Sequence, residues 1–216
     1  MRLVILGASG GCGRHLTTQA VTAGHEVVAV GRDTSDLPSG DGITHQRGEL
    51  TDASFLESCF AGADAVLLAV GFRLAGLAPW NKPADPTFLR RCAEATVAAA
   101  KATGVGRLMA ISAGGVGDSY ADMPGAFKMF IRFSSLKHAY PELKVMEDVL
   151  LASGLDVCIS RPSGLTDEPA TGAVVTPNTY RGRAMIPRAD VAGWMLEQLS
   201  HDPFPLRTPL ITVTGG

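Results

Sequence analysis

Three glycines follow an apolar run at the start of the chain, where a strand would pass into a helix. The run RLVIL occupies residues 2–6, and Gly7, Gly10 and Gly13 come next in the stretch GASGGCG. Glycine permits positive φ angles and close approach of a ligand, and the free N–H groups at a helix start attract an anion such as a pyrophosphate. The spacing is GxxGxxG where the common fingerprint is GxGxxG, but the fingerprint requires the same place at a strand-to-helix junction. We therefore predict that this turn binds the phosphates of a dinucleotide.

Cys12 lies inside this turn, at the expected start of the first helix. A helix start can lower the pKa of a thiol, so a redox-active Cys12 is one interpretation. The other is that Cys12 is a small residue that fills space beside the glycines, and this is the interpretation we favour.

A second chemical signal follows the next apolar run, EVVAV at residues 26–30. At the end of the second strand, an acidic residue would bind the ribose 2′-hydroxyl of NADH, whereas an arginine would accept the 2′-phosphate of NADPH. Glu26 stands at the wrong end of the run, and Arg32 follows it in the stretch GRD. We predict that Arg32 selects NADPH and that NADH is the less favoured cofactor. Asp33 leaves two alternatives open, because it could pair with Arg32 or bind NADH itself.

Tyr140 and Lys144 have the YxxxK spacing with which short-chain dehydrogenases protonate a carbonyl. On one helical face the ammonium would lower the pKa of the phenol, and Ser112 would complete a catalytic triad. However, Pro141 follows the tyrosine, and proline favours the first helical turn while excluding the residue before it from the helix. We predict a helix over residues 142–153, with Tyr140 as a packing residue at its start. A catalytic Tyr140–Lys144 pair is the alternative.

Strands and helices alternate regularly along the chain and must position these residues. The expected strands are nearly continuous in apolar character, which is typical of parallel strands buried on both faces. They are residues 2–6, 26–30, 65–70, 107–112 and 156–160, with a weaker strand at 43–47 and a last strand at 209–213. Helix-compatible spacing occupies residues 11–23, 53–61, 85–103, 142–153 and 188–200. The sequence therefore predicts an α/β fold, a doubly wound and mainly parallel Rossmann-type sheet with helices on both faces, as a single domain over residues 1–216.

Composition excludes several classes of function. The net charge is −2 and no Lys/Arg-rich run occurs, so we expect no nucleic-acid partner. The apolar runs are too short to cross a bilayer, and the N-terminus lacks a signal-peptide pattern, so we expect no membrane partner. The four cysteines have no metal-binding spacing, which predicts reduced thiols, a cytoplasmic location and no metal site. They are Cys12, Cys59, Cys92 and Cys158.

Several segments together resemble a known family. They are GASGGCG, GRD, GELTD (48–52), SGLDVCISRP (153–162), LTDEPATG (165–172) and ADVAGWMLEQL (189–199). In these segments the chain is similar to the atypical short-chain dehydrogenase/reductases of the NAD(P)H-binding, NmrA-like group, and within it to the biliverdin-IXβ and flavin reductase-like subgroup. The resemblance runs over nearly the whole chain. It implies an NADPH-dependent enzyme that transfers hydride to a flavin, a linear tetrapyrrole or another conjugated, quinone-like acceptor.

The resemblance also implies a set of cofactor contacts. The pyrophosphate would lie on the turn formed by Gly7, Ala8, Ser9, Gly10, Gly11, Cys12 and Gly13. Glu49 and Leu50 would edge the adenine, although the family usually has Asp at position 49. The remaining positions would lie beside the ribose and the nicotinamide: Ala69, Val70, Gly71, Ser112, Ala113 and Pro162. All follow the carboxyl ends of strands, where an open α/β sheet binds its ligand. Ser112 has an alternative role, as a strand-end serine that satisfies a backbone group.

Two further segments leave the binding edge, at residues 71–83 and 123–141. Phe127, Phe130 and Phe133 are spaced by three, which predicts a helical stripe that covers the core. Arg73 and Trp80 are candidates for contact with a flat, anionic substrate. Two other functions stay open: a dinucleotide-sensing regulator without turnover, and an ordinary carbonyl reductase that uses Tyr140 and Lys144. The small chain favours the reductase, as a monomer or a small homo-oligomer.

Overall fold

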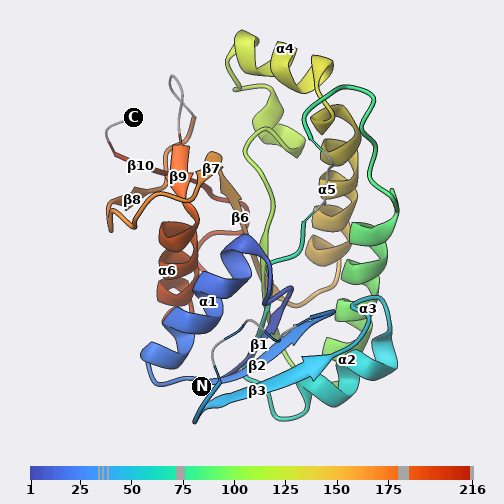
Figure 1. The fold of residues 1–216 in the computed structure, drawn as a ribbon, viewed down its shortest axis with the longest axis vertical. Coiled ribbons are helices and arrows are strands. Elements are labelled where there is room, and N and C mark those ends of the chain that lie inside the picture. Colours follow the sequence, from blue (N-terminus) through green and yellow to red (C-terminus); the bar gives the residue numbers. More distant parts are fainter. Residues whose placement is uncertain (34, 36, 38, 72–75, 180–184, 215–216) are drawn as a thin grey trace.

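A computed structural model describes residues 1–33, 35, 37, 39–71, 76–179 and 185–214 of the chain. Its central sheet has eight strands in the order β3-β2-β1-β4-β5-β6-β10-β8, and only β8 runs antiparallel to its neighbour (Figure 1). The strands are β1 (Arg2–Leu6), β2 (Glu26–Gly31), β3 (Ile43–Arg47), β4 (Ala65–Leu68), β5 (Arg107–Ile111), β6 (Asp156–Pro162), β8 (Val174–Val175) and β10 (Leu210–Val213). The mainly parallel, doubly wound sheet is the predicted one.

Helices cover both faces of this sheet (Figure 1). Helices α1 (Gly11–Thr22) and α6 (Arg188–Gln198) pack on one face, and α2 (Ala53–Phe60), α3 (Phe88–Thr103) and α5 (Leu136–Leu151) pack on the other. Within β1, Val4 and Leu6 contribute to the core under α2, α3 and α5, whereas Leu3 and Ile5 contribute to the core under α1 and α6. Burial of both faces is why these strands are almost entirely apolar in sequence. Within the described ranges, no helix is long and apolar enough to cross a membrane.

Strand β1 has a neighbour on each side, and this places three loops together. Leu6, its last residue, pairs with Val30 of β2 and with Leu68 of β4. The chain that follows each of these strands therefore leaves the sheet at the same edge. The Gly7 amide donates to the carbonyl oxygen of Val30, and the Ala69 amide donates to that of Leu6, each at 2.9 Å. This reversal of strand order is where open α/β sheets hold their ligands.

Helix α5 begins at Leu136, so the prediction that it starts at residue 142 is wrong. Pro141 lies inside the helix and lacks the N–H that would bond one turn back. The helix continues through it because its packed face spans both sides of the proline: Ala139, Met146 and Leu150 are all buried. Tertiary burial outweighs the local preference of proline for a helix start.

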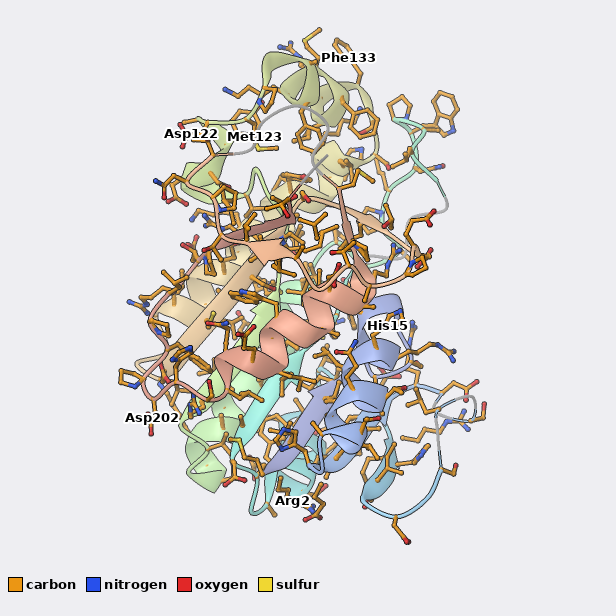
Figure 2. All side chains as sticks on the ribbon, turned by 90° about the vertical axis from the view of Figure 1, so that its left-hand side faces the viewer. Arg2, His15, Asp122, Met123, Phe133 and Asp202 are labelled. Carbon is orange, nitrogen blue, oxygen red and sulfur yellow. The ribbon has the colours of Figure 1, made fainter. Side chains whose placement is uncertain are left out.

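The chain between β5 and α5 forms a short 3-10 helix, η1 (Gly117–Tyr120), and helix α4 (Gly125–Phe133). The predicted phenylalanine stripe does not cover the core. Ile131 is the buried residue of α4, Phe127 packs partly against Met123, and Phe133 is 62% exposed. The reason is the place of α4 at one end of the molecule, beyond the sheet, where Phe133 points outward (Figure 2).

Two short strands outside the main sheet were not predicted. They are β7 (Gly164–Thr166) and β9 (Met185–Pro187), which pair in parallel. They are too short for a pattern of apolar alternation to identify them. Strand β9 leads directly into α6 and fixes where that helix begins.

Candidate cofactor and acceptor site

The turn between β1 and α1 is closed by its own backbone. Gly7 has a φ of +78°, and a Cβ atom added to it would lie 2.7 Å from the carbonyl oxygen of Ala69. A Cβ on Gly13 would overlap the carbonyl oxygen of Gly7, and the Gly10 amide donates to that same oxygen at 2.9 Å. The turn itself therefore requires glycine at positions 7 and 13, whether or not a ligand is bound.

The start of α1 is open to an anion. Gly10 is its N-cap, no described side chain bonds to this cap, and the first turn holds no acidic residue. The first amide groups of a helix have no partner within it, and they carry the positive end of the helix dipole. An uncapped helix start behind a glycine turn at the ligand-binding edge of the sheet fits a pyrophosphate.

Cys12 is buried in the first turn of α1, in the same core as Leu16. Burial raises the pKa of the Cys12 thiol to about 11, although the nearby Arg188 guanidinium acts to lower it. A thiol with this pKa is protonated at neutral pH and is a poor nucleophile. The burial and the raised pKa therefore favour the other interpretation, in which Cys12 fills space beside the turn.

The residues that follow β2, together with the nearby end of β3 and start of α1, form a corner of the site that carries more positive charge than predicted. Arg32 is exposed there and forms no ion pair with a described residue. The Asp33 carboxylate accepts from the Ser35 amide and hydroxyl at 3.0 and 2.7 Å. These bonds lower the pKa of Asp33, and the charges of Arg47 and Arg14 lower it further. Asp33 is thus engaged with Ser35, and the charges of two guanidinium groups act on it.

Arg14 and Arg47 are the residues of this corner that the sequence analysis missed. Arg47 ends β3 and pairs in register with Gly31, the residue before Arg32. The Arg14 guanidinium comes from α1 and donates from Nε to the carbonyl oxygen of Ser9 at 3.1 Å. The signal that could have identified Arg47 is its place at the end of a strand next to β2 in the sheet.

The remaining cofactor positions lie in loops at the same edge. Leu50 and Val70 are buried, whereas Glu49 and Gly71 are exposed. Ala8 is buried, and its amide donates to the carbonyl oxygen of Val30 at 3.1 Å. Apolar side chains thus form the base of these loops, and exposed backbone and the Glu49 carboxylate form their rim.

Ser112 directly follows β5 and carries a buried hydroxyl. Its amide donates to the carbonyl oxygen of Ser160 at 2.8 Å, but its Oγ has no hydrogen-bond partner among the described residues. The alternative role, a serine that satisfies a backbone group, therefore has no support in the described part of the chain. The loop that follows Ser112 begins with the half-buried Ala113. The next residue is Gly114, whose amide donates to the carbonyl oxygen of Pro162 at 2.8 Å, so Pro162 lies beside this loop. A buried hydroxyl without a partner is unfavourable by about 1–3 kcal/mol, and a ligand would remove that penalty.

Tyr140 and Lys144 share helix α5, and each is hydrogen-bonded to a different partner. The Tyr140 hydroxyl donates to the carbonyl oxygen of Gly114 at 3.0 Å, and burial raises the pKa of the phenol. Lys144 Nζ lies 2.5 Å from both carboxylate oxygens of Asp148, one turn farther along α5. A catalytic tyrosine needs a neighbouring cation that lowers its pKa, and Tyr140 is perturbed in the opposite direction.

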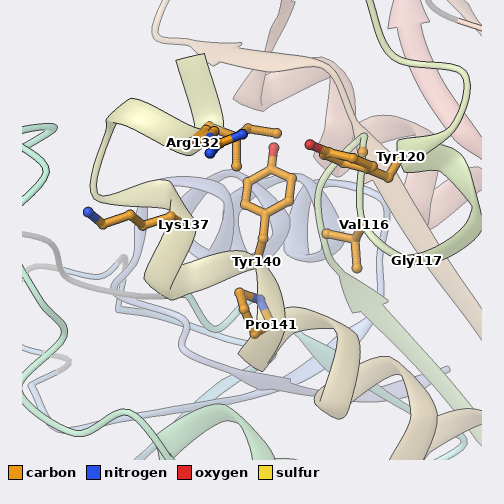
Figure 3. Close-up of a pocket in the computed structure, with 9 residues that line it drawn as sticks. Val116, Gly117, Tyr120, Arg132, Lys137, Tyr140 and Pro141 are labelled. Carbon is orange, nitrogen blue, oxygen red and sulfur yellow. The ribbon is translucent and has the colours of Figure 1, made fainter. Parts of the chain in front are cut away.

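A pocket of about 460 Å³ lies beyond the loop that follows Ser112 (Figure 3). Its lining residues are Gly115, Val116, Gly117, Tyr120, Ile131, Arg132, Lys137, Tyr140 and Pro141. Figure 3 shows the hydroxyl end of Tyr140 directed toward Arg132 and Tyr120. The pocket therefore combines apolar and aromatic walls with two cations from α4 and α5. Neither Arg132 nor Lys137 forms an ion pair with a described residue.

A buried ion pair supports the wall of this pocket. The Arg161 guanidinium, from β6, donates to the Glu147 carboxylate from Nε at 3.0 Å and from Nη2 at 2.7 Å. It also donates to Asp118 of η1 at 2.6 Å. Arg161 and Glu147 are almost fully buried, and a Cβ on Gly117 would lie 3.0 Å from Arg161 Nη2. The pair thus fixes η1 against α5 and β6.

Of the two predicted substrate contacts in the segment after β4, the structure describes only Trp80. Trp80 is 78% exposed and is not among the residues that line the pocket. Arg73 lies outside the described residues. Contact of either residue with a substrate stays a prediction.

Comparison with known proteins places the chain in a broad group of dinucleotide-binding folds. A family model described as NAD(P)H-binding matches residues 7–202. The chain is similar to ChuY, an anaerobillin reductase from Escherichia coli O157:H7, with 21% identity and a TM-score of 0.79 over 100% of this chain and 98% of that one. It is also similar to a short-chain dehydrogenase/reductase from Veillonella parvula DSM 2008 in complex with NADP, with 17% identity and a TM-score of 0.82 over 99% of this chain and 95% of that one.

Among curated proteins the similarity is local. An uncharacterized protein from Mycobacterium bovis is 41% identical over 68 residues, which is 31% of this chain. The match spans only 8% of that protein's length.

Proposed function

The chain belongs to the NAD(P)H-binding family, and we propose that it uses NADPH to reduce a flat, conjugated acceptor such as a flavin, a linear tetrapyrrole or a quinone. The observation that carries this proposal is that Ser112 and the pocket lie on the same loop. The loop after β5 runs from Ser112, with its unpartnered buried hydroxyl, directly to a pocket with apolar walls and two cations. A reductase needs a cofactor and an acceptor in contact, and this loop joins the two sites.

The residues present fit a nicotinamide dinucleotide. The turn from Gly7 to Gly13 would hold the pyrophosphate, because it has an uncapped helix start and, among the described residues, the nearest atoms to a Cβ on Gly10 are backbone atoms. Ser112 would hydrogen-bond the nicotinamide carboxamide or the acceptor and set their mutual orientation. When bound, the cofactor supplies the hydride. The protein then has to bind the cofactor and the acceptor, orient them toward each other, and exclude water from between them.

Three arginines support NADPH over NADH. Arg47 ends β3, and Arg32 directly follows β2, the neighbouring strand. Arg14 is near enough to lower the pKa of Asp33 together with Arg47. A guanidinium group binds a phosphate with charge-assisted hydrogen bonds. The carboxylate that could bind a ribose 2′-hydroxyl instead, Asp33, accepts two bonds from Ser35.

The pocket supports an acceptor that is flat, largely apolar and anionic at one end. Tyr120 and Ile131 provide apolar surface, and Arg132 and Lys137 provide positive charge. A conjugated acceptor can take its proton from water, whereas a simple ketone develops an alkoxide that needs a positioned acid. The raised pKa of Tyr140 therefore favours the conjugated acceptor over the carbonyl reductase alternative.

The regulatory alternative makes a different demand on the structure. A dinucleotide sensor needs the cofactor turn but can dispense with a pocket beside it, and the pocket beyond Ser112 favours turnover.

The four cysteines are free thiols, which supports the predicted cytoplasmic location.

A panel assay tests the proposal. NADPH oxidation is followed by absorbance with FMN, FAD, biliverdins, quinones and simple ketones, and binding of NADPH is titrated in parallel. We expect turnover with at least one conjugated acceptor and none with the ketones. Tight NADPH binding with no turnover on any acceptor would favour the sensor, and preferential turnover of ketones would favour the carbonyl reductase.

A further inference from the structure

Arg188, from the far end of the chain, lies across the start of α1. It is the first residue of α6, which packs beside α1 on the same face of the sheet (Figure 1). A Cβ atom on Gly11 would lie 2.7 Å from Arg188 Cδ and 2.8 Å from Arg188 Nε. The arginine side chain therefore occupies the space that the missing side chain of Gly11 leaves. Glycine is required at positions 7 and 13 because a Cβ there would overlap the backbone of the turn or of Ala69. At position 11 it is required because a Cβ would overlap the Arg188 side chain.

The position of this arginine is fixed by contacts between elements. Gln19 of α1 donates from Nε2 to the carbonyl oxygen of Ala189 at 2.9 Å. The Asp190 carboxylate accepts from the Thr171 amide and hydroxyl and from the Gly172 amide, at 2.7–3.1 Å. These bonds hold the start of α6 against α1 and against the loop before β8.

The charge of Arg188 is unfavourable where it lies unless an anion is present. The amino end of a helix carries positive potential, which acidic side chains or bound anions normally balance. The first turn of α1 has no acidic residue and its cap has no side-chain bond from a described residue. Arg188 is also close enough to Cys12 to act on the pKa of that thiol. Two sources of positive potential, the helix start and a guanidinium, thus converge on one point at the ligand-binding edge.

The anion that balances Arg188 in this structure is Asp167. Arg188 Nη1 lies 2.7 Å from Asp167 Oδ1, and the side chain of Asp167 is 85% exposed whereas that of Arg188 is 27% exposed. Because the carboxylate partner is exposed to solvent, the pair contributes little stability and another anion can replace Asp167. A guanidinium has five N–H donors, and a phosphate is a better match to it than a single carboxylate oxygen.

We propose that Arg188 is a cofactor-binding residue whose guanidinium binds the pyrophosphate of the dinucleotide, and that Asp167 is the internal anion with which the pyrophosphate competes. This inference rests on the proposed use of NAD(P)H. It assigns Arg188 a role different from that of Arg32, because the pyrophosphate is common to NADPH and NADH whereas the 2′-phosphate is not. It also connects cofactor binding to the segment around β7 through the release of Asp167.

Calorimetric titration of NADPH and NADH into four variants tests this proposal. We expect Arg188→Gln to weaken the binding of both cofactors by about tenfold and to leave their ratio unchanged, because one charge-assisted contact is lost. Arg188→Lys should retain most of the affinity. Asp167→Asn should tighten both cofactors a few-fold, and the double variant Arg188→Gln/Asp167→Asn should bind like Arg188→Gln alone.

Arg90→Gln is the matched control, because Arg90 is an exposed arginine on α3 with a carboxylate partner, Glu94, at 3.9 Å. It should bind both cofactors like the wild type, and thermal melts should show that every variant is folded. Unchanged affinity in Arg188→Gln, or a loss confined to NADPH, would overturn the assignment of Arg188. Unchanged or weaker binding in Asp167→Asn would overturn the competition. If the wild type bound neither cofactor, the proposed function would fail and this inference with it.

Discussion

The turn after β1 and helix α4 after β5 both follow the carboxyl ends of parallel strands, yet they are held by different kinds of contact. The turn is enclosed by backbone: its Gly7 amide donates to Val30, and Gly7 packs against the carbonyl of Ala69. Helix α4 is held through its buried residue Ile131, and it leaves Phe130 and Phe133 largely exposed.

This difference has a functional meaning. A cradle made of backbone tolerates almost no change, so it remains suited to one kind of ligand. A surface made of side chains at the end of the molecule can change residue by residue without loss of the fold. We therefore expect the proposed cofactor side of the site to accept few substitutions and the proposed acceptor side to accept many.

The largest effect that the comparison predicts is at Gly13. A Cβ there would overlap the carbonyl oxygen of Gly7, whereas a Cβ on Gly10 would lie 3.1 Å from it. We expect Gly13→Val to destabilise the fold itself, and Gly10→Val to remain folded but lose NADPH binding, because its side chain would enter the cradle. Thermal melts and a cofactor titration measure both effects. A Gly13→Val variant with a wild-type melting temperature would show that the turn is less rigid than its contacts indicate.

A smaller effect is expected at Asp190, which ties α6 to the loop before β8. Burial opposes its ionisation, but the bonds from Thr171 and Gly172 lower its pKa overall. A carboxyl group with a lowered pKa stabilises the fold above its unfolded pKa of about 3.9, and this stabilisation is lost as the pH falls through the folded pKa. We expect Asp190→Asn to reduce the free energy of unfolding by about 1.5–3 kcal/mol at neutral pH.

Urea denaturation of both proteins at neutral pH and at about pH 3 measures this difference. The difference in free energy of unfolding between wild type and Asp190→Asn should narrow at the lower pH. The reason is that the Asp190 carboxyl group of the unfolded wild-type chain then takes up a proton, whereas its lowered pKa in the folded state delays protonation there. A difference of equal size at both pH values would mean that the charge of Asp190 adds no stability.

At the corner after β2, we expect Arg32→Ala to weaken NADPH binding by about tenfold and to leave NADH binding nearly unchanged, because only the 2′-phosphate loses a partner. Arg47→Ala should act in the same direction with a smaller loss. Titration of each variant with both cofactors measures the ratio. Equal affinity of the wild type for NADPH and NADH would contradict the assignment of this corner.

The smallest effect is expected on α4. Phe133 is 62% exposed, so Phe133→Ser should change the free energy of unfolding by no more than about 0.5 kcal/mol. Cofactor affinity should also be unchanged, because α4 lies outside the cofactor cradle. Denaturation and titration test both statements, and a loss of more than about 2 kcal/mol would mean that α4 is part of the core.

The sequence was sufficient to predict the sheet and the family because both depend on local patterns. Runs such as RLVIL are apolar at every position since both faces of β1 are covered, and the glycines that follow are required by the turn. The predicted NAD(P)H-binding family is confirmed by the family match over residues 7–202, and the predicted fold is shared with solved structures of similar architecture.

Other features depend on contacts between distant segments, which no local pattern contains. Helix α5 continues through Pro141 because its buried face lies on both sides of the proline. Arg188 reaches Gly11 across 177 positions of sequence, from residue 188 back to residue 11, because α6 packs beside α1. The exposure of Phe133 could not be predicted from its spacing, since the same stripe would cover a core if α4 lay over the sheet.

We propose that hydride transfer in this protein depends on positioning by Ser112 and not on an acid supplied by Tyr140. The measurement is kcat/KM with the best acceptor at saturating NADPH for Tyr140→Phe and Ser112→Ala, with folding checked by thermal melts. We predict that Tyr140→Phe keeps most of its activity, because its hydroxyl donates to Gly114 and its pKa is raised by burial. Ser112→Ala should lose about ten- to a hundredfold, the effect of one lost contact of about 1–3 kcal/mol. A loss of about a thousandfold in Tyr140→Phe with little change in Ser112→Ala would contradict the claim and assign the phenol as the acid of a carbonyl reductase.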